Sequence, residues 1–217
     1  MVAMIVHKFH SGFHLNPKDG MLLAAATNSR GHFQQGEFDG ACGIYCIVMG
    51  LVSCGVITTG QARHIANSKR RLLAQFWREA EKFFFAGTTG AEIADLIARC
   101  LPMVKARLFG PGHTSVLQRV IAALEQGRFA IVRIADWSYE FDHWTVVSGV
   151  QGKLERRRFD ATALLLLDPS FQAPRHCLYN GVIELSKTRK AHRYIQEGNA
   201  EHVYLVEALI MYAPGAL

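Results

Sequence analysis

The stretch DGACGIYCIVMGLVSC, residues 39–54, decides how the rest of this sequence is interpreted. No residue between positions 40 and 62 is charged, and the apolar residues leave no polar face, which is typical of a helix buried on all sides. The uncharged length is close to that of a membrane span, but its five glycines favour a helix inside a folded core. We therefore expect a buried helix over residues 42–54 that ends near Gly55, and no membrane span.

Cys42 begins this helix between the small residues Ala41 and Gly43. A cysteine thiol, with a pKa of ~8.5 when free, ionises more readily at a helix N-terminus beside a protonated imidazole. Small neighbours let a substrate approach the sulfur, and the N–H groups of the first helical turn can hold an oxyanion. These features make Cys42 a candidate nucleophile, although most buried cysteines are only small apolar core residues. We assign that core role to Cys46 and Cys54.

A cysteine nucleophile needs a histidine as its base and usually a third side chain that orients the imidazole. His143 begins the β-branched run HWTVV, residues 143–147, which predicts a strand that delivers the imidazole to a cleft. Asp168 follows the apolar run ALLLL, residues 163–167, and precedes Pro169, so it lies at the end of a predicted buried strand. The sequence thus supplies a base and an orienting acid at the ends of two predicted strands.

The composition predicts one globular domain over residues 1–217, because half of the residues are hydrophobic and 19% are charged. The net charge is +6, but the basic clusters at 69–71, 156–158 and 187–193 are scattered and form no nucleic-acid motif, so we expect no nucleic-acid partner. Five cysteines are an odd number in a chain too long to need disulfides, so we expect reduced thiols. With no secretory signal evident, these thiols indicate a cytoplasmic protein, or one delivered from the cytoplasm without a classical signal peptide.

Periodicity and turn residues predict helices first and strands afterwards, which is the α+β arrangement. Residues 1–40 are expected to form an irregular lead-in with one strand near 4–7. Further helices are expected over residues 61–85, from Thr88 or Thr89 to about Cys100, and over 116–126 before Gly127. Later strands are expected over residues 129–134, 144–150, 163–167, 182–185 and 203–212, with a hairpin turn at Gln151-Gly152.

In their order along the chain, Cys42, His143 and Asp168 resemble the catalytic residues of the papain-like cysteine peptidases. The resemblance is closest to the bacteriocin-processing peptidases that cleave double-glycine leaders, and it covers roughly residues 33–170. It rests on short segments in the family's order, at residues 42–43, 55–58, 87–90, 117–127, 129–134, 143–150 and 167–169. It implies an α+β papain-like fold with a helical part over about 40–127 and a mostly antiparallel sheet over about 128–217.

The family uses a glutamine before the cysteine to stabilise the oxyanion, and the resemblance assigns this role to Gln35. Gln35 precedes Cys42 by seven residues and Gln34 precedes it by eight. Both gaps are slightly longer than is usual in the family, so Gln34 is an alternative to Gln35.

The segment KLERRRFD, residues 153–160, makes the path from His143 to Asp168 longer than a simple hairpin requires. We expect it to protrude as a basic hairpin. Its Asp160 is an alternative to Asp168 as the third residue of the site. We prefer Asp168, because ALLLL is typical of a buried strand whereas ERRRF is typical of an exposed one.

The resemblance implies a thiol hydrolase that cleaves a peptide or isopeptide bond through a thioester, without a metal or an organic cofactor. Cys42 is expected to attack the carbonyl, His143 to move the proton and Asp168 to fix the ring tautomer. Gln35 and the backbone N–H of Cys42 are expected to hold the oxyanion. An acyltransferase or transglutaminase-like enzyme of the same fold and a catalytically idle protein-binding domain are the alternatives. The expected partner is a protein or peptide substrate, acidic where it meets the basic hairpin.

Overall fold

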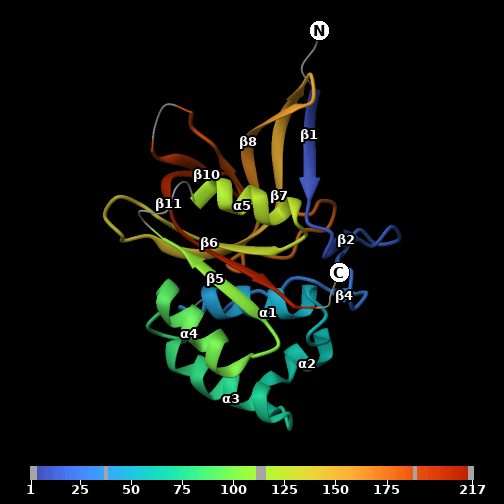
Figure 1. Ribbon diagram of the computed structural model, residues 1–217, viewed down its shortest axis with the longest axis vertical. Coiled ribbons are helices and arrows are strands. Elements are labelled where there is room, and N and C mark those ends of the chain that lie inside the picture. The colour runs from blue at the N-terminus through green and yellow to red at the C-terminus, as the bar shows by residue number, and fades with distance from the viewer. Residues whose placement is uncertain (1–3, 37–38, 111–115, 188–189, 215–217) are drawn as a thin grey trace.

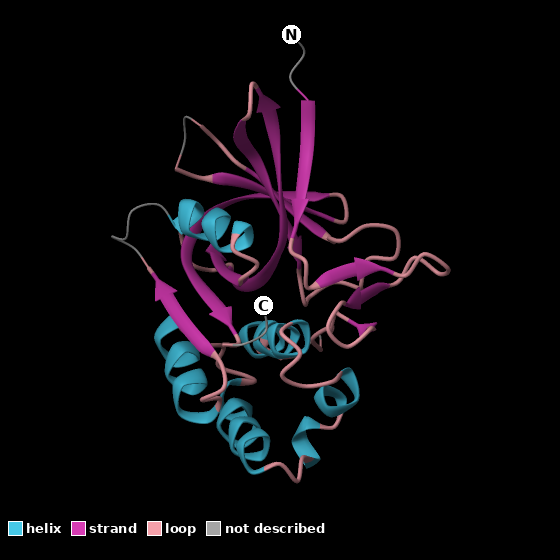
Figure 2. Cartoon of the chain, turned by 45° about the vertical axis from the view of Figure 1, so that its right-hand side comes forward, coloured by secondary structure: helices cyan, strands magenta, loops and turns pink. Residues whose placement is uncertain are grey.

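The computed structural model describes residues 4–36, 39–110, 116–187 and 190–214, and it places a group of helices beneath an antiparallel β-barrel (Figure 1). The helices are α1 Cys42–Ser53, α2 Thr59–Arg63, α3 Arg71–Ala80, α4 Gly90–Cys100 and α5 Val116–Glu125. The strands are β1 Met4–Phe9, β2 Phe13–Leu15, β3 Leu22–Ala24, β4 Ser29–Arg30, β5 Lys105–Phe109, β6 Phe129–Ala135, β7 Asp142–Glu155, β8 Arg158–Leu167, β9 Gly181–Glu184, β10 His192–Gln196 and β11 Asn199–Tyr212. Helices α1 to α4 gather at one end of the molecule, and α5 lies apart from them beside the barrel (Figure 2).

Local side-chain chemistry sets the helix starts that the sequence predicted. Helix α1 begins at Cys42 and ends at Ser53, and all of its residues except Tyr45 are buried. Helix α4 begins with the expected capping box, in which Thr89 accepts a hydrogen bond from the N–H of Glu92 and the Glu92 carboxylate accepts one from the N–H of Thr89. The predictions of these two helices are confirmed.

The continuous helix expected over residues 61–85 is wrong. The chain forms α2, a 3₁₀ turn at Ile65–Asn67, then α3 and a second 3₁₀ turn at Glu81–Phe83. Ser68 has extended backbone angles, and its hydroxyl accepts a hydrogen bond from the N–H of Arg70. Serine side chains compete in this way with helical backbone hydrogen bonds, which explains the break between α2 and α3.

The sheet is antiparallel, as expected, and it closes on itself. Strands β7, β6, β11, β10, β9 and β8 pair in that order, and β8 pairs again with β7. Strand β1 is added to β7, and β5 is added to β11. The closure and the strands β5 and β10 differ from the arrangement that the sequence predicts. The irregular lead-in expected over residues 1–40 is wrong in part, because β2, β3 and β4 form a small sheet there.

The hairpin turn expected at Gln151-Gly152 is wrong. Strand β7 continues to Glu155, and the chain turns at Arg156 and Arg157, whose φ angles are 47° and 71°. Gly152 instead allows a close cross-strand approach, because a Cβ atom there would lie 2.5 Å from the ring of Phe159 on β8.

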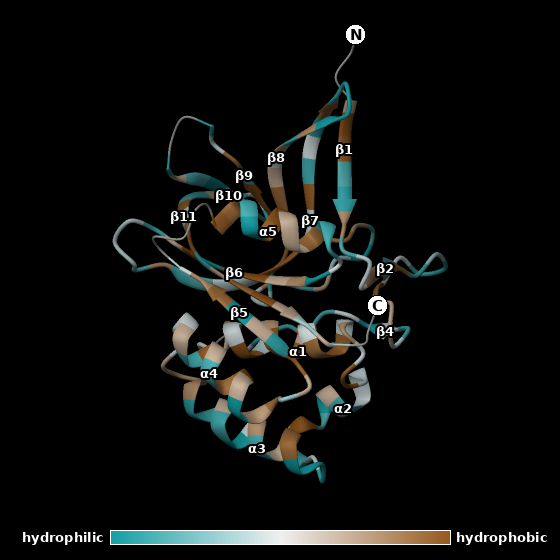
Figure 3. Ribbon diagram, in the orientation of Figure 1, coloured by the Kyte–Doolittle hydropathy of each residue, from teal (hydrophilic) through white to brown (hydrophobic). Residues whose placement is uncertain are grey.

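Two apolar cores meet at the faces of β6 and β7, whose residues alternate between them. Ile131 and Val146 face the core around α1, while Val132 and Val147 face the barrel interior. Figure 3 shows the hydrophobic residues along these strands and along α1. Helix α5 packs into the barrel core, so the helical part consists of α1 to α4 and ends near Cys100 rather than near residue 127.

None of the helices in the described ranges combines the length and the apolar character that a membrane crossing requires.

Candidate active site

The N-terminus of α1 brings Cys42 against strand β7. The Cys42 sulfur accepts a hydrogen bond of 3.4 Å from the backbone N–H of Trp144, and it lies 3.9 Å from the carbonyl oxygen of Gly40. Only 7% of Cys42 is exposed to solvent. Ala41 precedes the helix and has no side chain that could accept a hydrogen bond from the first turn. The backbone N–H groups of that turn therefore bind no capping side chain at this position. A backbone N–H donor at the sulfur is the kind of contact that stabilises a thiolate.

His143 lies near the start of β7, directly before Trp144. Its Nε2 atom donates to the Asp168 carboxylate at 2.8 Å, which leaves Nδ1 as the second ring nitrogen, and the Cys42 thiol is close enough to raise the pKa of the ring. Burial lowers the pKa of His143, but the charge of Asp168, its hydrogen bond and the nearby Cys42 thiol raise it to about 10. For Asp168, burial raises the pKa, and the charge of His143 with its hydrogen bond lowers it below its ordinary value. The arrangement therefore favours an imidazolium beside a carboxylate.

Asp168 is fully buried, and both its carboxylate and its backbone groups are hydrogen-bonded. Its Oδ1 atom also accepts the N–H of Ser170 at 2.7 Å, and its Oδ2 atom accepts the hydroxyl of Tyr194. Asn180 binds both backbone groups of Asp168, at 2.7 Å to the N–H and 2.9 Å to the carbonyl. The buried His32 binds the same carbonyl at 2.8 Å. This residue is thus fixed in place by both its backbone and its carboxylate.

The alternative acid, Asp160, is placed elsewhere. It is half-exposed on β8, opposite Lys153 of β7, and it forms an ion pair with Lys187. This pairing lowers the pKa of Asp160, chiefly through the hydrogen bond from Lys187. Of the two acids, the structure brings Asp168 and not Asp160 to His143.

Gln35 approaches the site through its backbone. Its N–H donates to the carbonyl of Pro169 at 2.8 Å, next to Asp168. Its side-chain amide donates to the carbonyl of Asp39 at 3.3 Å, and its buried Oε1 atom has no hydrogen-bond partner among the described residues. Gln34 is exposed. The structure therefore places Gln35 inward and Gln34 outward, with the Gln35 amide bound to the loop that leads into α1.

Gly43 explains why α1 approaches β7 so closely. A Cβ atom at this position would lie 2.6 Å from Ile93 and 3.2 Å from the ring of Trp144, and it would also meet the hydroxyl of Thr88. The indole N–H of Trp144 in turn donates to the carbonyl of Thr88 at 2.8 Å. The absence of a side chain at Gly43 therefore lets α1, α4 and β7 meet next to Cys42.

The remaining cysteines differ from Cys42 in their surroundings. All five thiols are free. Cys46 is fully buried, its thiol donates to the carbonyl of Trp144 at 3.5 Å, and burial raises its pKa well above the ordinary value. Burial also raises the pKa of Cys54, at the other end of α1, to about 11. The core role predicted for Cys46 agrees with its burial, whereas Cys54 is only partly buried.

Sequence reasoning missed the residues that hold Asp168. His32, Asn180 and Tyr194 come from three separate segments, and none lies in a pattern that predicts contact with Asp168. Pro169-Ser170 directly after the acid is the one local signal, because a turn there points the Ser170 N–H back at the carboxylate.

Comparison with known proteins adds no family: no protein-family model matches the chain, and no curated protein matches it significantly.

Proposed function

We propose that this protein is a papain-like cysteine peptidase that cleaves a peptide or isopeptide bond through a thioester. One observation carries the proposal: Cys42, His143 and Asp168 come from three distant segments and meet at one place. His143 donates to Asp168 at 2.8 Å, and the Cys42 sulfur accepts the backbone N–H of Trp144, the residue after His143, and lies close enough to raise the pKa of His143. A thiol that was only a small core residue would need no imidazole, and the imidazole would need no buried carboxylate behind it.

The proposed reaction begins from an ion pair in which Nδ1 of His143 holds the proton of Cys42. The thiolate attacks the substrate carbonyl carbon, and the backbone N–H of Cys42 stabilises the oxyanion. His143 then gives its proton to the leaving amine, and the carbon–nitrogen bond breaks to leave a thioester on Cys42. Water, deprotonated by His143, attacks the thioester and releases the acid and the free thiol. Gln35 is the second oxyanion donor, provided that its amide exchanges the carbonyl of Asp39 for the substrate oxygen.

Thiol alkylation tests the nucleophile directly. Iodoacetamide at neutral pH should label Cys42 much faster than Cys46, because Cys42 has an imidazole partner whereas burial keeps the Cys46 thiol protonated. Peptide mapping after a short exposure identifies the labelled cysteine. In H143A the labelling of Cys42 should slow to that of an ordinary thiol while the fold is retained. Equal labelling of Cys42 in both proteins would remove His143 from its role and with it the proposed mechanism.

Hydrolysis is tested with a peptide library analysed by mass spectrometry, using C42A as the control. The proposal predicts cleaved products that carry a new carboxylate and that vanish in C42A. Addition of a primary amine distinguishes the acceptor: amide products in place of acids would show an acyltransferase. Selective labelling of Cys42 without any turnover would favour a protein-binding domain.

A further inference from the structure

A basic groove lies between β5, β11 and α5, away from Cys42. Its volume is about 390 Å³, and it is lined by the side chains of Lys105, Arg107, Arg119 and Arg128. Among the residues that the structure describes, no aspartate or glutamate lines this groove. None of its four cations forms an ion pair with a carboxylate in the described ranges. Four like charges without a neutralising partner indicate a site for a multiply charged anion.

Aromatic rings hold the three arginines of this groove in place. The guanidinium groups of Arg107 and Arg119 lie 4.9 Å and 5.3 Å from the ring centre of Phe109, and that of Arg128 lies 4.8 Å from the ring of Tyr212. Stacking on a ring leaves the N–H donors at the edge of a guanidinium free to bind an anion in a forked geometry. Three of the four cations of the groove are therefore exposed arginines that aromatic rings orient.

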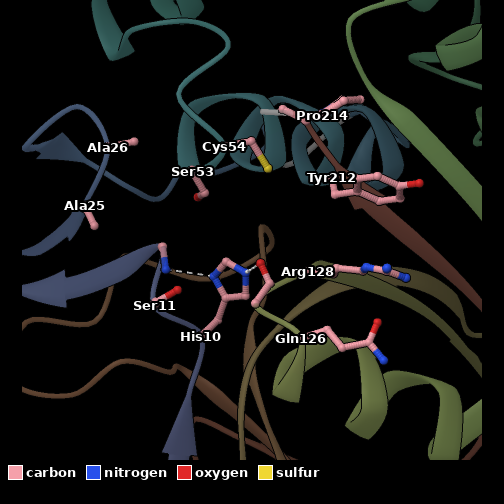
Figure 4. Close-up of a pocket in the computed structure, with 13 residues that line it drawn as sticks. His10, Ser11, Ala25, Ala26, Ser53, Cys54, Gln126, Arg128, Tyr212 and Pro214 are labelled. Carbon is pink, nitrogen blue, oxygen red and sulfur yellow. Dashed lines mark hydrogen bonds between the residues drawn. The ribbon is translucent and has the colours of Figure 1, made fainter. Parts of the chain in front are cut away.

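A second, neutral pocket adjoins the groove at Arg128 (Figure 4). Its volume is about 700 Å³, and it shares Gln126, Arg128 and Tyr212 with the groove. Arg128 extends away from His10, toward the space between Tyr212 and Gln126. No aspartate or glutamate among the described residues lines this pocket either. Arg128 is thus the boundary between an uncharged pocket and a strongly cationic groove.

The floor of the neutral pocket offers one unused hydrogen-bonding group. The hydroxyl of Ser53 is buried, with 5% of the residue exposed, and has no partner among the described residues. It lies at the end of α1 that faces His10 (Figure 4). His10 is saturated, since Nδ1 accepts the N–H of Gly12 at 2.9 Å and Nε2 donates to the carbonyl of Gly127 at 3.1 Å. Burial lowers the pKa of His10, so this wall stays uncharged at neutral pH.

We propose that the groove and the pocket form one binding site for an organic polyphosphate. The phosphates lie on the four cations, because a phosphate chain concentrates several negative charges in a volume as small as the groove. The uncharged body of the ligand fills the neutral pocket and hydrogen-bonds to Ser53. The volume of this pocket lies in the range of sites for small organic molecules. Ser53 and Cys42 lie at opposite ends of α1, ~16 Å apart along the helix axis at 1.5 Å per residue, so this site is separate from the candidate active site.

Calorimetric titration at low salt tests the proposal with ATP, inorganic triphosphate and adenosine as probes. ATP should bind more tightly than triphosphate or adenosine, because only ATP fills both parts. The double variant R107Q/R119Q should bind ATP and triphosphate at least about tenfold more weakly. The matched control R70Q/R71Q removes two exposed arginines from the helical part and should leave both affinities unchanged. Failure of triphosphate to bind, or an equal loss in the control, would overturn the anion groove.

Replacement of Ser53 by alanine tests the neutral pocket separately. S53A should weaken ATP binding and leave triphosphate binding unchanged. The free protein should keep its stability, because the Ser53 hydroxyl has no partner in the fold to lose. ATP binding no tighter than that of triphosphate, or unaffected by S53A, would overturn the role of the pocket. Neither result bears on Cys42, whose alkylation serves as an independent check on the proposed peptidase.

Discussion

Replacement of Asp168 by asparagine should keep the geometry around His143 and remove the charge behind it. The Oδ1 atom of Asp168 accepts both His143 Nε2 and the N–H of Ser170. The Ser170 N–H therefore orients an asparagine with its oxygen toward His143, and the amide group faces the oxygen of Tyr194, which can accept. The Ser170 contact therefore keeps an oxygen facing His143, and the variant loses the charge of the carboxylate rather than the tautomer that it fixes.

The effect of the Asp168 charge can be measured in how the free energy of unfolding depends on pH. Burial lowers the pKa of His143, and the contacts with Asp168 and Cys42 raise it from 6.5 to about 10. A histidine whose pKa is raised on folding stabilises the native state fully below pH 6.5, and this stabilisation is lost as the pH rises toward 10. The rise corresponds to at most about 5 kcal/mol. In D168N the His143 ring stays buried but no longer has a negative charge beside it. Protonation of His143 should therefore destabilise the fold as the pH falls.

Urea unfolding of the wild type and D168N at a series of pH values between about 6 and 10 measures this effect. The wild type should be more stable than the variant by the largest amount near the acid end of this range, and the difference should shrink toward the alkaline end. D160N is the matched control, because Asp160 is half-exposed and pairs with Lys187 rather than with His143. Parallel stability curves for the wild type and D168N would refute the pairing of Asp168 with a charged His143.

Two further substitutions test the packing of the site. Tyr194→Phe removes the hydroxyl that donates to Asp168, which leaves a buried carboxylate oxygen short of a donor, so unfolding experiments should show a loss of about 1–3 kcal/mol. An unchanged stability would mean that this hydrogen bond does not support the carboxylate. Gly43→Ala should cost about 1–3 kcal/mol, because the new methyl group meets Thr88 and its neighbours. The matched control is Gly60→Ala in α2, where the nearest atom to the new methyl group lies 3.8 Å away, and a small gain of up to about 1 kcal/mol is expected.

The parts of the fold that follow from short-range chemistry could be predicted. Helix α4 starts where the Thr89–Glu92 capping box places it, and α1 is buried along the uncharged run that predicts it. Strand β10 was missed because only Tyr194 in HRYIQ is fully buried, which is too weak an alternation to predict a strand. Closure of the barrel depends on the pairing of β8 with β7 and with β9, and no local pattern encodes such long-range pairing.

The same distinction applies to the candidate site. Cys42, His143 and Asp168 each lie at the end of an apolar run, so the sequence marks them as polar groups delivered by buried elements. The choice of Asp168 over Asp160 also follows from local burial, because ALLLL is buried and the hairpin that precedes it is not. The support behind Asp168 could not be predicted, since it depends on which segments the closed barrel brings to the end of β8.

The hydrogen bonds that fix Asp168 indicate which parts of the chain the candidate site needs. The resemblance to papain-like peptidases covers roughly residues 33–170, yet three of the groups that fix Asp168 lie outside this range. His32 precedes it, while Asn180 and Tyr194 follow it on the segments that carry β9 and β10. A fragment ending at residue 170 would lack β9, β10 and β11, so the barrel would be open and the Asp168 carboxylate would lose the Tyr194 hydroxyl. The last fifth of the chain, which carries none of the proposed catalytic residues, is therefore needed to hold the acid against His143.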